Sequence, residues 1–167
     1  MAAVVSEAAS GLVVRALEPR DHEALAALMA EMQAHYRVPC PDRAEILAGL
    51  SALPPGVEIL VAERAGAVLG FASACPLYPG PGLKSGFFLK EIYVSEAARG
   101  AGIGGRLMRA LAGLAVERGH RRLDWTADAD DERLLRFYES LGGTAQPKKL
   151  FYRLTGPALD DLAGGED

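Results

Sequence analysis

The chain has 167 residues, 50% of them apolar and 24% charged, and its formal net charge is −4. This length suffices for one domain with a sizeable core, and the slightly acidic balance argues against the basic surface that nucleic-acid binding requires. Its cysteines, Cys40 and Cys75, form neither a zinc spacing nor a disulfide framework, so we expect a reducing compartment. Because no apolar run approaches ~20 residues and the start lacks a signal-peptide pattern, we expect no membrane association and a cytoplasmic location.

The first half of the chain predicts a strand, two helices and a hairpin. Residues 12–17 are a short β-branched strand, and residues 22–36 repeat apolar side chains at helical spacing. A second helix over residues 43–53 starts at Asp42 and is stopped by a pair of prolines. Two β-rich runs within residues 57–78, separated by Ala-Gly, predict a hairpin.

The second half predicts alternating strands and helices. The loop over residues 78–86 is rich in glycine and proline. The order strand, helix, helix, then three strands, helix, strand, helix, strand is that of an α/β layer domain with helices covering a mixed sheet. The later expected elements are a strand over 87–94, a helix ended by Gly119, a strand over 121–127, a helix over 130–143 and a last strand over 148–154.

A glycine-rich stretch stands between the strand ending at Val94 and the helix that follows it. The first amides of a helix lack partners within the helix and lie at the positive end of its dipole, so this arrangement favours binding of a phosphate. Arg99 and Arg106 add charge on either side. The alternative is a turn that merely needs positive φ angles. The glycines are Gly100, Gly102, Gly104 and Gly105.

These residues resemble the GCN5-related N-acetyltransferase (GNAT) superfamily. The text "RGAGIGGRLM" follows "LKEIYV" and precedes "LLRFYESLGG", and the loop pattern Arg/Gln-x-x-Gly-x-Gly/Ala is met by Arg99, Gly102 and Gly104. The resemblance implies a GNAT fold: a mixed, mostly antiparallel sheet of about six to seven strands flanked by about four helices. It also implies that the strand ending at Val94 splays from the strand ending near Ala127. We expect the domain to span residues 12–155, with flexible tails at 1–11 and 156–167.

The resemblance implies direct transfer of an acetyl group from acetyl-CoA to the primary amine of a small molecule, without an acyl-enzyme. No metal is expected, because the acidic run at residues 128–132 complements a helix N-terminus and lacks the spacing of a calcium loop. A homodimer is expected from the family. Two alternatives stay open: a peptide or protein amine as acceptor, or a non-catalytic module that only binds acetyl-CoA.

The resemblance also implies a binding site made largely of backbone. Amides of the glycine loop hold the CoA pyrophosphate, and the bulged strand before it binds the pantetheine arm and the thioester carbonyl, with Val94 as the amide donor. Asp131 stands where many members have asparagine, so it can cap a helix but has no amide hydrogen to donate. The expected cofactor-binding residues are Ile92, Tyr93, Val94, Arg99, Gly100, Ala101, Gly102, Ile103, Gly104, Gly105, Arg106, Asp131 and Tyr138.

Two side chains are candidates for proton transfer. Tyr138 matches the family tyrosine that protonates the leaving thiolate, and the alternative is an aromatic helix anchor together with Phe137. Glu91 is the candidate base for the incoming ammonium ion, and the alternative is a cross-strand ion pair. Strand alternation puts Leu89, Glu91 and Tyr93 on one face, although a β-bulge would shift that register.

The local text is closest to the diamine/polyamine acetyltransferase branch but departs from it twice. That branch typically has two adjacent acids in the central strand, and the first of them is replaced here by Lys90. A Tyr-Glu pair that ends the first helix in that branch is His35-Tyr36 in this chain. Both changes remove negative charge, so a polycationic acceptor is disfavoured.

Overall fold

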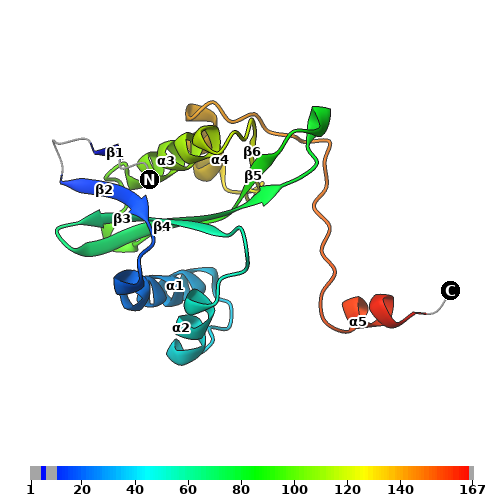
Figure 1. Ribbon diagram of the computed structural model, residues 1–167, viewed down its shortest axis with the longest axis horizontal. Coiled ribbons are helices and arrows are strands. Elements are labelled where there is room, and N and C mark those ends of the chain that lie inside the picture. The colour runs from blue at the N-terminus through cyan, green and yellow to red at the C-terminus, as the bar shows by residue number, and fades with distance from the viewer. Residues whose placement is uncertain (1–4, 7–10, 166–167) are drawn as a thin grey trace. The chain divides into compact units, whose positions relative to one another are not determined.

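The centre of the fold is a sheet with the strand order β1-β2-β3-β4-β5-β6 (Figure 1). The computed structural model describes residues 5–6 and 11–165. All neighbouring strands pair antiparallel except β5 and β6, which are parallel, so the predicted mixed and mostly antiparallel sheet is confirmed. The strands are β1 (Val5–Ser6), β2 (Leu12–Ala16), β3 (Glu58–Arg64), β4 (Ala67–Leu77), β5 (Gly86–Val94) and β6 (Leu123–Trp125).

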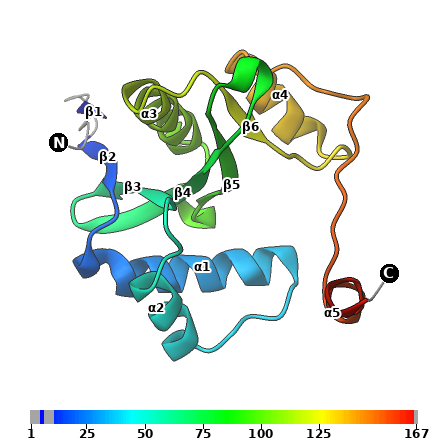
Figure 2. The same cartoon turned by 45° about the vertical axis from the view of Figure 1, so that its right-hand side comes forward.

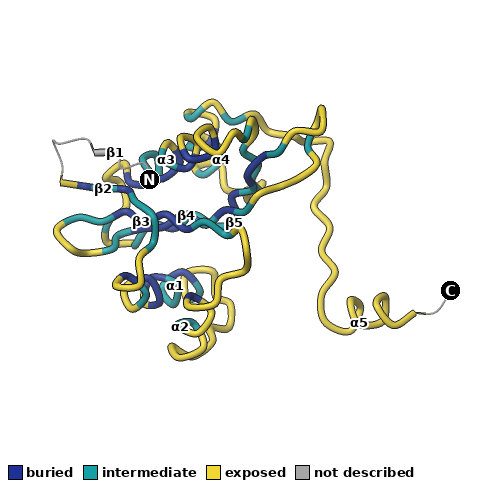
Figure 3. The backbone as a smooth tube through the Cα atoms, in the orientation of Figure 1, coloured by how far each residue is buried: buried dark blue, intermediate teal, exposed yellow. Residues whose placement is uncertain are grey.

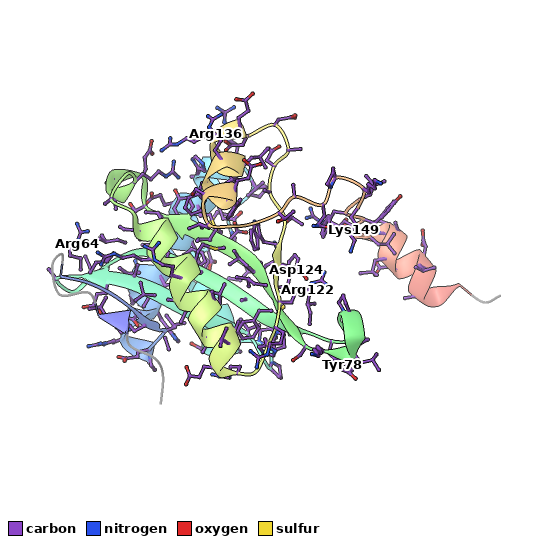
Figure 4. All side chains as sticks on the ribbon, turned by 90° about the horizontal axis from the view of Figure 1, so that it is seen from above. Arg64, Tyr78, Arg122, Asp124, Arg136 and Lys149 are labelled. Carbon is purple, nitrogen blue, oxygen red and sulfur yellow. The ribbon has the colours of Figure 1, made fainter. Side chains whose placement is uncertain are left out.

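Helices cover both faces of this sheet. Helices α1 (His22–Tyr36) and α2 (Arg43–Ser51) lie on one face, and α3 (Ile103–Glu117) lies on the other (Figures 1 and 2). Figure 4 shows α3 from above, lying across the strands. Buried residues follow the central strands and recur along α1 and α3 (Figure 3). On the α1 side the buried cluster is Leu25, Ala26, Leu28, Met32, Leu50, Ile59, Val61, Phe71 and Tyr93.

Local sequence signals explain where several elements begin and end. The Asp42 carboxylate accepts a hydrogen bond from Glu45 N at 2.9 Å, which caps α2 as predicted. Ala65 and Gly66 both have positive φ angles, 50° and 82°, as a two-residue hairpin turn requires. The predicted hairpin, the first two helices and the helix after the glycine stretch are all confirmed.

A partly buried ion-pair network fixes the start of α1 against the sheet. Arg15 on β2 pairs with Asp21 at 2.6 Å and with Glu63 on β3 at 2.5 Å. Asp21 is only 5% exposed, and it ends the 3-10 turn Pro19–Asp21 that leads into α1. The hydrogen bonds from Arg15 hold the pKa of the Asp21 carboxyl below its usual range despite burial. The network therefore sets the position from which α1 runs across the sheet.

The chain divides into two compact units, Met1–Thr126 and Ala127–Asp167. The second unit contains α4 (Glu132–Ser140) and α5 (Pro157–Gly164). The described chain therefore has five α-helices where about four were expected, and α5 lies within the predicted C-terminal tail. Across residues 11–165, no helix is long and apolar enough to cross a membrane.

The predicted last strand over residues 148–154 does not form. Leu150, Phe151 and Tyr152 are exposed, and no strand in the described chain pairs with them. Alternation of apolar and polar residues indicates that a segment would suit a half-buried sheet surface. A strand nevertheless forms only where a partner strand supplies hydrogen bonds. The predicted strand over 121–127 is also shortened, to the three residues of β6.

Gly70 allows β4 and β5 to approach closely at the end of β5. A Cβ atom added at Gly70 would lie 2.8 Å from the Tyr93 carbonyl oxygen and 3.3 Å from side-chain atoms of Leu107 and Val94. A separation of 2.8 Å from a backbone atom requires the strands to move apart. The two strands can therefore pack at this distance only because Gly70 has no side chain.

We expect Gly70→Ala to lower the free energy of unfolding by about 1–3 kcal/mol, because overpacking forces backbone shifts. Gly113→Ala is the matched control, since nothing lies within 4 Å of a Cβ at that helical position. The control should leave stability unchanged or raise it by up to about 1 kcal/mol. Urea denaturation of both variants checks this, and equal midpoints would contradict it.

Candidate active site

The central strand β5 contains one extra residue relative to its partner β4. Ser73 pairs with Glu91 and Ala74 pairs with Leu89, so Lys90 has no counterpart. This is the β-bulge that the resemblance implied for the strand before the glycine loop. A bulge of this kind bends the strand and shifts the faces of the residues beyond it.

The bulge places Glu91 on the α1 face of the sheet and Leu89 on the opposite face. Tyr93 pairs with Phe71, and both belong to the buried cluster beneath α1 and α2. Ser73 is two residues from Phe71 and so shares its face, as does its partner Glu91. The prediction that Leu89 shares a face with Glu91 is therefore wrong, because uninterrupted alternation ignores the extra residue.

Beyond the bulge, β5 has an edge that β6 does not cover. The β5–β6 pairing ends at Leu89 with Trp125, while β5 continues to Val94. Ser95 N donates to Leu69 O at 2.9 Å, so the backbone groups of Ser95 face β4. In an antiparallel pair, the backbone groups of successive residues point alternately toward the partner strand and away from it. The N–H and C=O of Val94 and Ile92 therefore point away from β4, toward the open edge.

Glu91 is a half-buried carboxylate beside the Lys90 ammonium group. Its side chain is 29% exposed, and the Lys90 ammonium lies 3.9 Å from one of its oxygens. Burial raises the pKa of the Glu91 carboxyl above its ordinary value, although the Lys90 charge acts in the opposite direction. A carboxylate with a raised pKa is a stronger base, which suits removal of a proton from an ammonium ion.

The C-terminal end of α1 brings aromatic rings to the same face of the sheet. The His35 ring centroid lies 5.9 Å from that of Tyr93 and 5.3 Å from that of Tyr36. His35 and Tyr36 are both exposed at this helix end. The departures from the polyamine branch, at Lys90 and at this helix end, therefore concern the face that carries Glu91.

The glycine stretch forms a bare helix N-terminus. Gly100 and Gly102 have φ angles of +83° and +74°, the left-handed region that favours glycine. The backbone hydrogen bond from Arg106 N to Gly102 O opens α3, so the amides of residues 103–105 precede it. The helix has no side-chain cap and no acidic residue in its first turn.

This donor set fits a pyrophosphate. Backbone amides at a positive helix end, without side chains in front of them, allow phosphate oxygens to approach closely. Ile103 is 1% exposed and anchors the first turn in the core. Arg99 Nε donates to Val94 O at 3.2 Å, and Arg106 Nη1 donates to Leu12 O at 3.4 Å. Arg99 thus links the loop to the end of β5.

Glu31 on α1 contacts the end of β5, a role that sequence reasoning missed. Its carboxylate accepts hydrogen bonds from Glu96 N at 2.7 Å, Tyr93 Oη at 3.1 Å and Ser95 Oγ at 3.2 Å. One signal was available: Glu31 lies three residues after Leu28, next to the buried stripe of its helix.

The electrostatics of this contact favour the charged form of Glu31. Burial acts to raise the pKa of the Glu31 carboxyl, but the hydrogen bonds from Glu96, Tyr93 and Ser95 and the charge of Arg99 together hold it below its ordinary value. Burial and the neighbouring Glu31 raise the pKa of Tyr93. Tyr93 therefore stays a hydrogen-bond donor at neutral pH.

The remaining predicted residues belong to the second unit. Asp131 caps α4, since its carboxylate accepts a hydrogen bond from Leu134 N at 2.9 Å. Tyr138 is 7% exposed, and its ring centroid lies 5.2 Å from that of Phe137. Their roles in binding and catalysis stay predictions. Among the described residues, no group of three or more His, Cys, Asp or Glu side chains is arranged to hold a metal ion.

Comparison with known proteins identifies relatives. The model of the acetyltransferase (GNAT) family matches residues 23–143. An L-ornithine N5-acetyltransferase of Arabidopsis thaliana is 35% identical over 57% of this chain, and the match spans 42% of that enzyme's length. A D-amino-acid N-acetyltransferase of Saccharomyces cerevisiae is 25% identical over 87% of this chain and 91% of its own. The solved structure of an integron cassette protein from the V. cholerae mobile metagenome has a TM-score of 0.84 at 29% identity, covering 93% of this chain and 99% of that one.

We expect the Glu91 carboxyl to titrate above the usual glutamate value of about 4.3. The Lys90→Met variant should raise the Glu91 pKa further, because it removes the Lys90 charge, which lowers that pKa. Carboxyl NMR titration, with Glu91→Gln used to assign the signal, measures both values. A Glu91 pKa at or below the usual value, or a lower pKa in Lys90→Met, would contradict this assignment.

Proposed function

This chain belongs to the GNAT family of acetyltransferases, and from that premise we propose that it acetylates the primary amine of a small molecule, with acetyl-CoA as donor. The family uses acetyl-CoA as cosubstrate and the chain is an acyltransferase. The observation that carries the proposal is the uncovered edge of β5 from Ile92 to Val94, directly before a bare helix N-terminus.

In this proposal the backbone binds the donor. The amides of residues 103–105 hold the pyrophosphate at the start of α3. The Val94 N–H donates to the thioester carbonyl, where negative charge develops during attack. The pantetheine arm lies along the open edge that begins after Leu89. Support comes from the end of the β5–β6 ladder and from the positive φ angles of the loop.

Two side chains move the protons. Acetyl-CoA supplies an activated acyl group, and the amine nitrogen bonds to its carbonyl carbon as the carbon–sulfur bond breaks. Glu91 accepts the proton that the ammonium ion must lose, directly or through a water. Tyr138 donates a proton to the leaving thiolate, a role that rests on sequence resemblance alone. The second proton, which the acylated nitrogen loses, returns to the Tyr138 oxygen directly or through a water.

For the acceptor, we infer an amine of the amino-acid type over a polyamine. The two relatives act on ornithine and on D-amino acids. Lys90 places a positive charge 3.9 Å from Glu91, which repels a polycation but tolerates an acceptor that carries its own carboxylate. Peptide amines remain the second acceptor class, and a non-catalytic acetyl-CoA-binding module is the alternative of another kind.

The proposal predicts release of free thiol from acetyl-CoA with amines such as ornithine, lysine or a D-amino acid, and slower release with spermidine. Tyr138→Phe should lower kcat by about 100-fold, the range of general acid catalysis. Tyr152→Phe is the matched control, since it removes the same hydroxyl from a tyrosine that is 85% exposed in the same unit. A thiol-detection assay over an amine panel that includes aminoglycosides and short peptides measures this.

The outcomes separate the alternatives. Turnover with peptides and with none of the small amines would show that the acceptor is a peptide or protein amine. Binding of acetyl-CoA without turnover of any amine would favour the non-catalytic module. Full activity in Tyr138→Phe would show that Tyr138 is not the general acid. A chain that does not bind acetyl-CoA would contradict the proposed function.

We also propose that the chain forms a homodimer. Support comes from the second unit, where a run of apolar side chains is exposed and belongs to no strand of the described chain. Light scattering after size exclusion should give twice the monomer mass, and Phe151→Lys with Leu150→Lys should shift it toward the monomer. A monomeric wild-type chain would contradict this. The exposed apolar residues of the run are Leu150, Phe151, Tyr152 and Leu154.

A further inference from the structure

Glu31 is the α1 side chain that accepts hydrogen bonds from the turn joining β5 to the glycine loop. Its three donors lie within residues 93–96 and are 62 to 65 positions away in the sequence. One donor is a backbone amide, Glu96 N, in the short 3-10 turn Glu96–Ala98 that leads to Arg99. A contact to backbone constrains the path of the chain more directly than a contact between side chains alone.

The contact continues through Tyr93 and Arg99 to Val94. The Tyr93 hydroxyl donates to Glu31, while the Arg99 guanidinium carbon lies 5.3 Å from the Tyr93 ring centroid. Arg99 Nε in turn donates to Val94 O. The network therefore begins on α1 and ends on the residue whose N–H points toward the open edge of β5.

Resting on the proposed function, we propose that Glu31 is a positioning residue for the CoA site. By fixing residues 93–96, it holds the Val94 N–H and the first amides of α3 at the spacing that one CoA molecule needs. Glu31 does not touch the reacting atoms. A small displacement suffices for a large effect, since misplacement by about 1 Å can cost about 100-fold in rate.

Two substitutions at Glu31 distinguish the effects of hydrogen bonding, charge and packing. Glutamine removes the charge and can keep the hydrogen bonds, whereas methionine removes both. The oxygen Oε1 of Glu31 accepts from both Tyr93 and Glu96, while Oε2 accepts from Ser95. A glutamine carbonyl oxygen can keep the first two bonds, and its NH₂ group can donate to the Ser95 hydroxyl oxygen. Methionine keeps the approximate volume and loses all three bonds.

The experiment measures CoA affinity by calorimetry, kcat and KM by thiol release, and amide hydrogen exchange, all on the full chain. We expect Glu31→Met to weaken CoA binding about 10-fold and to lower kcat about 10- to 100-fold. Its KM for the amine should change little. We expect Glu31→Gln to stay within about 3-fold of wild type for each constant, and exchange at Glu96 N to quicken only in Glu31→Met.

Two further variants serve as controls. Glu23→Gln removes the same charge from the same helix at an exposed site paired with Arg43, and it should change none of these readouts. If Glu31→Met does not fold, Ser95→Ala removes one bond from the other side of the contact. We expect it to weaken CoA binding about 2- to 5-fold, as for the loss of one hydrogen bond.

The results distinguish this inference from the function on which it rests. A wild-type chain that does not bind CoA overturns the proposed function and the inference with it. Wild-type binding that Glu31→Met matches, even at a lower melting temperature, overturns the inference alone. Equal damage in Glu31→Gln and Glu31→Met also overturns it, because charge would then matter and the hydrogen bonds would not.

Discussion

A single extra residue in β5 determines how the candidate site is arranged. Up to Leu89 the strand pairs on both sides, with β4 and with β6. At Lys90 the register shifts, and beyond it only the β4 side stays paired. The bend that a bulge introduces accounts for both the uncovered edge and the change of face. Glu91 consequently joins Tyr93 on the α1 face, while β6 leaves the neighbouring backbone groups unpaired.

The proposed binding surface consists of backbone groups, and the side chains around it have a common effect on that backbone. Gly70 permits the close approach of β4 behind Tyr93 and Val94, and the glycines of the loop keep the start of α3 bare. Backbone amides bind only where the chain is held still, because they cannot adjust by changing rotamer. We propose that Glu31 at the Tyr93 hydroxyl and Arg99 over the Tyr93 ring supply that restraint. In the proposed function, charged side chains thus both fix backbone amides in place and carry protons.

Sequence patterns predicted the elements well where the signal was local. Asp42 and Asp131 cap helices as expected, and Ala65-Gly66 makes the hairpin turn. The predictions failed where the outcome depends on distant partners. The segment 148–154 has the composition of a strand but no pairing partner in the described chain, and Leu89 faces away from Glu91 because β4 lacks a residue opposite Lys90.

The sequence by itself determined the family, the order of most elements and the glycine loop, because those depend on residue types at fixed short spacings. Only the tertiary structure decided which face Glu91 occupies, which backbone groups of β5 stay unpaired by β6, and that Glu31 contacts the turn after β5. Each of these depends on register between strands or on the packing of α1 over the sheet. Register and packing are set by contacts between residues far apart in the chain, as the separation of 65 positions between Glu31 and Glu96 illustrates. A pattern read along one segment carries no information about such contacts.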